Sequence, residues 1–208
     1  MNAKENSRNS FNHQAAVYDT TRYGAHARRM YGSILERVIS LQGLQKISSL
    51  LDIGCGTGEM LYLIQSRCSA MNLYGIDISE KMLDTARLKL GEKASLFWGD
   101  AENLPFDDGV FDLLICNDSF HHYPTPAKAL SEFRRVLRPG GLLLISDYHV
   151  GFPLRQLMNL FIRFGHDGDV RIYSKTEIVH LLSEASFGGI SYESVHTTGC
   201  MVMGSKTE

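Results

Sequence analysis

The sequence has no surplus of basic residues and no long hydrophobic run. Its 21 Lys and Arg residues are balanced by 23 Asp and Glu residues, which leaves a formal net charge of −2. A dedicated nucleic-acid-binding protein usually carries a clear positive surplus, so this balance argues against DNA or RNA as a partner. No stretch approaches the ~20 consecutive apolar residues that a membrane-spanning helix needs. We expect neither a nucleic-acid partner nor a membrane span.

Cysteines are few and far apart. Cys55, Cys68, Cys116 and Cys200 form no Cys-x-x-Cys pair, which a disulfide framework or a structural zinc site would show. Residues 1–10 are polar, lack the apolar segment of a signal peptide, and are expected to be loose. These features predict reduced thiols and a cytoplasmic location.

The length of 208 residues fits one domain of ordinary size, and the sequence shows no repeat or long linker. We expect a single domain over residues 1–208. Its expected parts are an N-terminal helical cap (1–45), an α/β core (46–150), a candidate substrate lid (151–175), and a C-terminal helix with a hairpin (176–208).

Short apolar runs alternate with helical patterns through the core. The runs are continuous rather than alternating, which is typical of parallel strands covered by helices on both faces. Two further runs near the C-terminus meet at Thr197–Gly199 and could form a hairpin. The pattern predicts a doubly wound α/β fold. The expected strands cover residues 48–53, 72–76, 94–98, 110–116, 142–146, 189–196 and 200–205.

Three polar residues stand directly before helical patterns. We expect Ser79, Thr125 and Ser174 to cap the helices that follow them, with Glu177 completing a capping box behind Ser174. The helix after Thr125 is expected to continue as far as Pro139–Gly141, which would end it.

The strongest local signal is a glycine turn, Asp52–Gly58, that follows one expected strand and opens a helix. A dinucleotide fingerprint spaces its glycines as G-x-G-x-x-G. Here Gly58 comes one residue early and Glu59 takes the last glycine's place, where a carboxylate would oppose a pyrophosphate. Asp52 could instead face a cation such as an α-ammonium group. The pattern favours an aminoacyl nucleoside, with a turn that binds nothing as the alternative.

Asp77 ends the second expected strand, ~20 residues after the turn, where an acidic residue can hold a ribose diol. The alternative is that Asp77 only caps the next helix, although Ser79 suffices for that.

Several runs, taken together, resemble class I methyltransferases that depend on S-adenosylmethionine. The subgroup most similar contains the ubiquinone/menaquinone biosynthesis C-methyltransferases and many small-molecule methyltransferases. The resemblance covers nearly the whole chain in the right order, and it implies a Rossmann-like seven-stranded sheet, mostly parallel with one antiparallel strand near the C-terminus. The matching runs are Phe11–Asp19, Asp52–Gly58, Asp77, Gly99–Phe106, Phe111–Leu114, Phe120–His122 and Glu132–Gly141.

The resemblance also implies S-adenosylmethionine as the cofactor and assigns residues to it. Asp52 would lie near the amino group and Asp77 would hold the ribose. Met82 would pack on the adenine, Asp100 would accept from its exocyclic amine, and Tyr18 would close over the donor. The implied cofactor-binding residues are Tyr18, Asp52, Gly54, Gly56, Gly58, Asp77, Ile78, Met82, Asp100, Ala101 and Asn117.

The candidates for chemistry follow the fourth and fifth strands. His121, His122 or Tyr148 could act as a general base or orient the acceptor. The alternatives are histidines that only shape the loop and a tyrosine that fills the pocket wall. Adjacent histidines without a third partner make a poor metal site, so no metal is expected.

An apolar stripe runs through the candidate lid. In the resembling family an insertion here commonly roofs the acceptor pocket, and ordinary core packing is the alternative. The stripe consists of Leu154, Leu157, Met158, Phe161 and Phe164, and an acidic group on the acceptor could meet Arg155, Arg163, Arg171 or Tyr173.

The sequence thus predicts methyl transfer from S-adenosylmethionine to a small-molecule acceptor. One alternative is a non-catalytic protein that binds the donor, as a sensor or an inactive subunit. A nucleotide-dependent oxidoreductase is the other, and Gly58 and Glu59 disfavour it. The oligomeric state is open, and a homodimer is compatible with the sequence.

Overall fold

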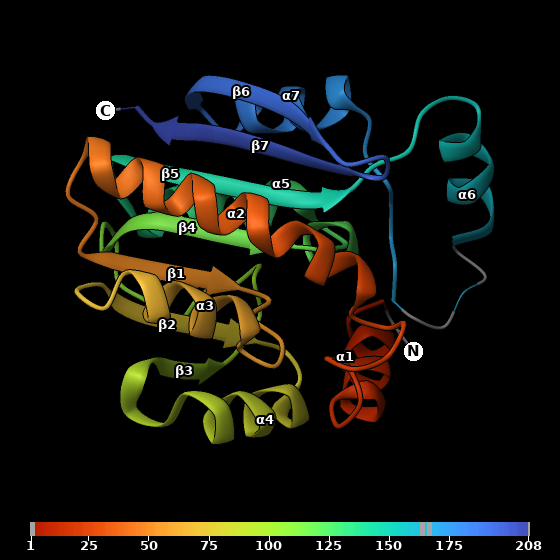
Figure 1. Ribbon diagram of the computed structural model, residues 1–208. Helices are drawn as coiled ribbons and strands as arrows, with labels where there is room; N and C mark the ends of the chain where they lie inside the picture. Colours follow the sequence, from red (N-terminus) through yellow and green to blue (C-terminus); the bar gives the residue numbers. More distant parts are fainter. Residues whose placement is uncertain (1–2, 163–164, 166–167, 208) are drawn as a thin grey trace.

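The computed structural model describes residues 3–162, 165 and 168–207. Its centre is one seven-stranded sheet with the order β3-β2-β1-β4-β5-β7-β6 (Figure 1). Strands β1 to β5 pair in parallel, whereas β7 runs antiparallel to both β5 and β6. The predicted fold, including its one antiparallel strand, is confirmed. The strands are β1 (Ser49–Ile53), β2 (Asn72–Asp77), β3 (Ser95–Trp98), β4 (Phe111–Asn117), β5 (Leu137–Tyr148), β6 (Phe187–Val195) and β7 (Gly199–Lys206).

Helices cover both faces of the sheet. Along β4, Leu113 and Ile115 join a buried cluster with α2, α3 and α4, whereas Leu114 and Cys116 join another with α5 and α7. This alternation follows from the two-residue period of a strand, which turns successive side chains to opposite faces. The helices are α1 (Ala3–Gln14), α2 (Ala25–Leu44), α3 (Glu59–Arg67), α4 (Glu80–Leu90), α5 (Pro126–Val136), α6 (Leu154–Ile162) and α7 (Lys175–Glu184), with short 3₁₀ turns η1 (Gly91–Lys93) and η2 (Phe120–His122).

The N-terminus differs from its prediction. Residues expected to be loose form α1 from Ala3 onward. Its bonds to other elements stabilise the helix: Lys4 pairs with Asp100, and Ser79 donates a hydrogen bond to Asn12 Oδ1. Tertiary contacts therefore override the polar local composition. Figure 1 shows α1 at the end of the sheet toward which the arrows of β1, β2 and β4 point.

Two of the three predicted caps are confirmed. Ser79 accepts from the Met82 amide at 3.1 Å, and Ser174 forms the full capping box with Glu177. Thr125 does precede α5, with Pro126 at the first helical position as predicted, but its hydroxyl makes no cap bond. Its backbone N–H instead donates to Glu102 Oε1 at 2.7 Å.

The predicted end of α5 is also wrong. The helix stops at Val136, and the segment Pro139–Gly141 lies inside β5, which already begins at Leu137. Pairing of Leu137 with Phe111 of β4 draws this segment into the sheet. A proline and two glycines therefore stand within a strand at its start rather than in a loop.

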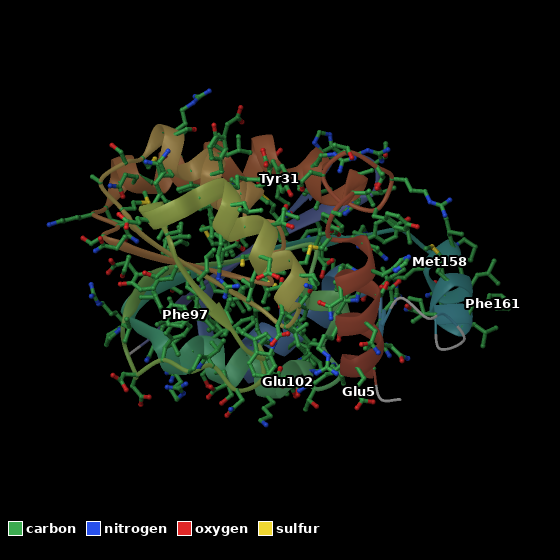
Figure 2. All side chains as sticks on the ribbon, turned by 90° about the horizontal axis from the view of Figure 1, so that it is seen from below. Glu5, Tyr31, Phe97, Glu102, Met158 and Phe161 are labelled. Atoms are coloured by element: carbon green, nitrogen blue, oxygen red, sulfur yellow. The ribbon has the colours of Figure 1, made fainter. Side chains whose placement is uncertain are left out.

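Helix α6 projects from the body of the molecule, and none of its residues is buried. Figure 2 shows Met158 and Phe161 at the edge of the molecule, and the Phe161 side chain is 60% exposed. Phe164 and Arg163, which belong to the predicted stripe and its flanking charges, lie outside the described residues. Within the described residues, no helix is both long and apolar enough to cross a membrane.

Candidate active site

A cavity opens at the carboxyl ends of β1, β2 and β4. This is the place where the strand order reverses, and open α/β sheets bind ligands there. Its empty space, including the open mouth, is about 910 Å³. Ten of the eleven residues predicted to bind the cofactor line it: Tyr18, Asp52, Gly54, Gly56, Asp77, Ile78, Met82, Asp100, Ala101 and Asn117.

Gly58, the eleventh, is not among the described lining residues. It precedes α3 with φ +75°, and an added Cβ would stand 2.7 Å from Leu90 Cδ1. This glycine therefore lets the turn pack against α4. Gly56 is different: its φ is +53° and nothing lies within 4 Å of its Cβ direction, so its backbone borders open space. A ligand can approach the chain closely there.

Asp77 connects the glycine turn to α4. Its carboxylate accepts from the Gly56 amide and from the Ser79 amide, each at 2.8 Å. Burial raises its pKa to about 6, although these backbone bonds act in the opposite direction. Asp77 thus helps to hold the following helix, as the alternative interpretation proposed, and it also lines the cavity.

Two buried oxygens in the cavity wall, Oδ1 of Asp52 and Oδ1 of Asn117, find no hydrogen-bond partner among the residues that the structure describes. Burial, with the nearby charge of Asp77, raises the pKa of Asp52 to about 8. Unsatisfied buried acceptors are unfavourable, and a bound group that donates N–H bonds would satisfy them. The α-ammonium group of S-adenosylmethionine has this chemistry, so the residues present fit that cofactor.

Helix α1 lies within the expected N-terminal helical cap, but the residues through which it lines the cavity were not predicted. Its residues Lys4, Ser7 and Phe11 line the wall. The Lys4 ammonium lies 2.6 Å from Asp100 Oδ2 and 2.6 Å from Glu102 Oε2. Asp100, predicted to meet the adenine, is thus already paired with a cation. No signal in residues 1–10 indicated this contact, because the pairing partners are about a hundred positions away.

Glu59 turns away from the cavity. Its carboxylate pairs with Lys89 at 2.6 Å, and Lys89 also binds Asp19 at 2.7 Å. Asp19 in turn accepts from the Thr57 hydroxyl at 2.6 Å. These bonds link the segment after α1 to the glycine turn and to α4. The role of Glu59 is therefore to hold α4 rather than to face a ligand.

The three candidates for chemistry differ in whether they line the cavity, although the rings of His121 and His122 lie only 4.1 Å apart. His122 lines the cavity, whereas His121 and Tyr148 are not among its described lining residues. Burial and the charge of neighbouring His121 lower the pKa of His122 to about 4, so its imidazole is neutral near pH 7. Tyr148 packs edge-on against His26, with the ring centroids 4.9 Å apart.

His121 is held by a carboxylate behind it. Its Nδ1 lies 2.5 Å from Asp147 Oδ1, and its backbone N–H donates to Asp147 Oδ2 at 2.9 Å. Burial alone would lower the pKa of His121, but the Asp147 charge and hydrogen bond outweigh it and raise the pKa to about 10. This imidazole is a cation at neutral pH.

The sequence patterns did not predict a second buried pair, which His26 forms with Asp118. His26 Nδ1 lies 2.6 Å from Asp118 Oδ1, and its Nε2 lies 2.9 Å from the Thr198 carbonyl. Both partners are acceptors, so both ring nitrogens donate and the ring carries a positive charge. Asp118 lines the cavity with a left-handed φ of 52°. The two residues are 92 positions apart, and no local pattern links them.

Comparison with known proteins now adds independent support. The family described as a methyltransferase domain matches residues 51–145. The malonyl-acyl-carrier-protein O-methyltransferase of Geobacter sulfurreducens is 30% identical over 88% of this chain and 70% of its own. A demethylmenaquinone methyltransferase of Staphylococcus epidermidis is 35% identical over 62% of this chain, which spans 56% of that relative's length.

Similarity also extends to solved structures. A chain of the complex between the Haloferax volcanii Trm112 methyltransferase activator and its methyltransferase superposes with a TM-score of 0.81. It covers 97% of this chain and 98% of its own at 18% identity, which shows a shared fold.

The fold and the cavity define an S-adenosylmethionine-dependent methyltransferase. The chain belongs to the class I family of these enzymes, and within it the chain resembles the menaquinone and ubiquinone methyltransferases. Its cofactor is S-adenosylmethionine, and its reaction is transfer of a methyl group from that cofactor. The non-catalytic and oxidoreductase alternatives are not favoured.

Proposed function

We propose that the cavity at β1, β2 and β4 holds S-adenosylmethionine through the residues predicted from the sequence. The unpartnered oxygens of Asp52 and Asn117 carry this proposal, because they leave acceptors where an ammonium group can donate. Asp77 would hold the ribose beside the glycine turn, and Met82 would pack on the adenine. Asp100 and the Ala101 amide would meet the adenine edge under the cover of α1.

The bound cofactor supplies a methyl group on a sulfonium, which is a reactive leaving group. The protein then has to align the acceptor and keep water out rather than form a covalent bond. Tyr18 and Phe11 stand together at the cavity wall, with ring centroids 6.2 Å apart. We assign these two rings to the exclusion of water.

The acceptor would bind at the end of the cavity where His122 lies. A neutral, buried imidazole can accept a proton or a hydrogen bond from an acceptor group. His121 and Tyr148 would act as positioning residues. Arg155 and Arg171, predicted to meet an acidic acceptor, both pair with Glu177. We therefore propose that the part of the acceptor molecule that faces Arg155 and Arg171 carries no charge.

The lid over residues 151–175 remains a prediction. Its helix α6 contributes no described residue to the cavity wall, and its apolar side chains are exposed. We propose that they meet an apolar or aromatic acceptor. A cytoplasmic location is also proposed, supported by four unpaired cysteines. A homodimer stays a prediction that light scattering would check.

Calorimetric titration with S-adenosylmethionine and S-adenosylhomocysteine tests the proposed site, with NAD as the control ligand. Saturable binding of the first two is expected, and Asp77→Ala should abolish it. Asp107→Ala removes an exposed carboxylate that does not line the cavity, and this variant should bind as the unmodified chain does. Binding of NAD alone, or of no ligand by folded protein, would contradict the proposal.

A further inference from the structure

Three side chains with metal-binding atoms meet beside the cavity: His121, His122 and Asp169. Their ligand atoms all lie within 4.8 Å of one another. The two histidines come from η2, and Asp169 comes from the segment between α6 and α7. Two imidazoles and one carboxylate form a donor set that suits zinc and similar transition metals. Asp169 is the third partner that the sequence pattern lacked.

The spacing of these atoms fits one ion. Asp169 Oδ1 lies 3.2 Å from His122 Nδ1 and 3.6 Å from His121 Nε2. Zinc bonds of roughly 2.0–2.2 Å at tetrahedral angles place neighbouring ligand atoms about 3.3 Å apart. The two observed distances bracket this value. The ligand atoms of the two histidines lie within 4.8 Å of each other, so rotation of the side chains would bring all three atoms to one ion.

The hydrogen bonding of the three side chains is incomplete, as expected for groups that bind a metal ion. His122 is only 9% exposed, and among the described residues its Nδ1 makes no hydrogen bond, although Asp169 Oδ1 lies 3.2 Å away. Asp169 makes ion-pair contacts with the two histidines, and among the described residues no hydrogen bond to its carboxylate is found. A buried imidazole nitrogen without a partner is unfavourable, and a metal ion would satisfy it.

A second group of potential ligands, Asp118, His121 and Asp147, lies close by. It is already saturated: Asp118 binds His26, and Asp147 accepts from His121 Nδ1 and from the Tyr148 amide. We therefore place the ion at Asp169 rather than at this group.

Supporting contacts orient the proposed ligands. The hydrogen bond that His121 Nδ1 donates to Asp147 leaves Nε2 to face Asp169, as carboxylates behind metal-binding histidines do. The Nε2 proton of the cationic ring would be released to solvent when the ion binds. The amides of Val170 and Arg171 donate to the His121 carbonyl at 2.9 and 3.2 Å. These backbone bonds hold the Asp169 segment against η2, so the three ligands approach each other within a bonded framework.

We propose that His121 Nε2, His122 Nδ1 and Asp169 bind one divalent transition-metal ion of the zinc class. Three protein ligands leave coordination positions open for water or an acceptor oxygen. His122 also lines the cavity, so the ion would stand beside the bound acceptor. Its role there rests on the proposed function: it would polarise an acceptor oxygen and help to orient it.

Metal titration of tag-free, chelator-treated protein tests this site. Zn²⁺ affinity is measured by competition with a chromophoric chelator, and Co²⁺ reports the ligand geometry through its visible absorption. We expect one ion per chain and a tetrahedral cobalt spectrum. Asp169→Asn and His121→Gln each remove a ligand and should weaken binding at least tenfold, since even changes behind the ligands cost about 10–100-fold.

The matched control is His180→Gln, which removes an exposed histidine paired with Glu184 on α7. This variant should bind metal as the unmodified chain does. The proposal is overturned if no saturable site exists, if Asp169→Asn binds equally well, or if thiolate bands show that cobalt binds cysteine. Calorimetry with S-adenosylhomocysteine on the same variants confirms folding. Because it reports the donor cavity separately, failure of the metal site and failure of the proposed function are distinguishable.

Discussion

The buried carboxyl group of Asp52 makes the stability of the protein depend on pH. Asp52 has a pKa of about 8 in the folded chain, against an ordinary value of 3.8. Between about pH 4 and pH 8 the folded state therefore keeps the proton of Asp52, whereas the unfolded state releases it. The stability of the ligand-free protein should fall as pH rises from about 4 to about 8 through this group.

Donor affinity should show the opposite trend. An ammonium group pairs with the carboxylate form of Asp52, so affinity for S-adenosylhomocysteine should rise with pH until Asp52 is ionised near pH 8. When binding releases one proton, the affinity can rise by at most about tenfold per pH unit. Calorimetry between pH 6.5 and 8.5 measures this slope. Asp52→Asn should bind more weakly and lose the slope; an unchanged slope in that variant would refute the assignment.

The glycines of the turn differ in what they tolerate. Gly58→Ala should destabilise the fold by about 2 kcal/mol or more, because a left-handed backbone and a crowded neighbour both resist a side chain. The contact is Leu90 Cδ1 at 2.7 Å. Urea unfolding measures the loss.

Gly56→Ala is the matched comparison, since Gly56 shares the positive φ but faces open space. Its stability loss should be smaller, about 1–2 kcal/mol from backbone strain alone. Donor binding should nevertheless weaken, because the new methyl group enters the cavity. Equal stability losses in the two variants would show that packing against α4 does not require Gly58.

At the scale of elements, α1 is a cover tied down by charge. Lys4 joins it to Asp100 and Glu102 across the cavity, and Asn12 joins it to the start of α4. A helix of 12 residues is marginal by itself, so these contacts decide whether it stays in place. We expect the donor to leave past this cover, because Lys4, Ser7 and Phe11 of α1 line the cavity.

Lys4→Met should therefore speed donor release. Loss of the paired ammonium loosens α1, and we expect the dissociation rate of S-adenosylhomocysteine to rise roughly fivefold or more, given about 1.5 kcal/mol for a charged hydrogen bond. Stopped-flow displacement measures this rate. Lys81→Met, an exposed lysine on α4 with a 3.7 Å pairing to Asp84, should leave it unchanged. Equal dissociation rates in the two variants would show that the Lys4 contacts of α1 do not control donor release.

At the scale of the whole molecule, donor binding should stabilise the entire fold. The cavity is built from β1, β2, β4, α1 and α4, so unfolding any of these removes it. S-adenosylhomocysteine at 100 times its Kd should add about 2.7 kcal/mol. For a chain of this size, that shift corresponds to a Tm increase of roughly 5–10 °C. Thermal denaturation followed by circular dichroism measures it, and a similar increase with NAD would contradict the cofactor assignment.

The sequence by itself determined the sheet and most of the residues that line the cavity. The glycine turn, Asp77 and Asn117 each lie at the carboxyl end of a strand, and parallel strands bring those ends to one edge. Local spacing is therefore enough to place them together. The helix caps at Ser79 and Ser174 could also be predicted from local spacing. A capping side chain bonds only to the first turn of its own helix.

Only the tertiary structure decided the contacts between distant segments. Lys4 meets Asp100, His26 meets Asp118, and Asp169 meets the two histidines of η2. These pairs form because helices and loops from separate parts of the chain cross the same sheet edge. The extension of β5 through Pro139–Gly141 has the same origin, since its partner strand β4 recruits it. Periodicity and capping report only on neighbours within a turn or a strand, so no local pattern encodes such contacts.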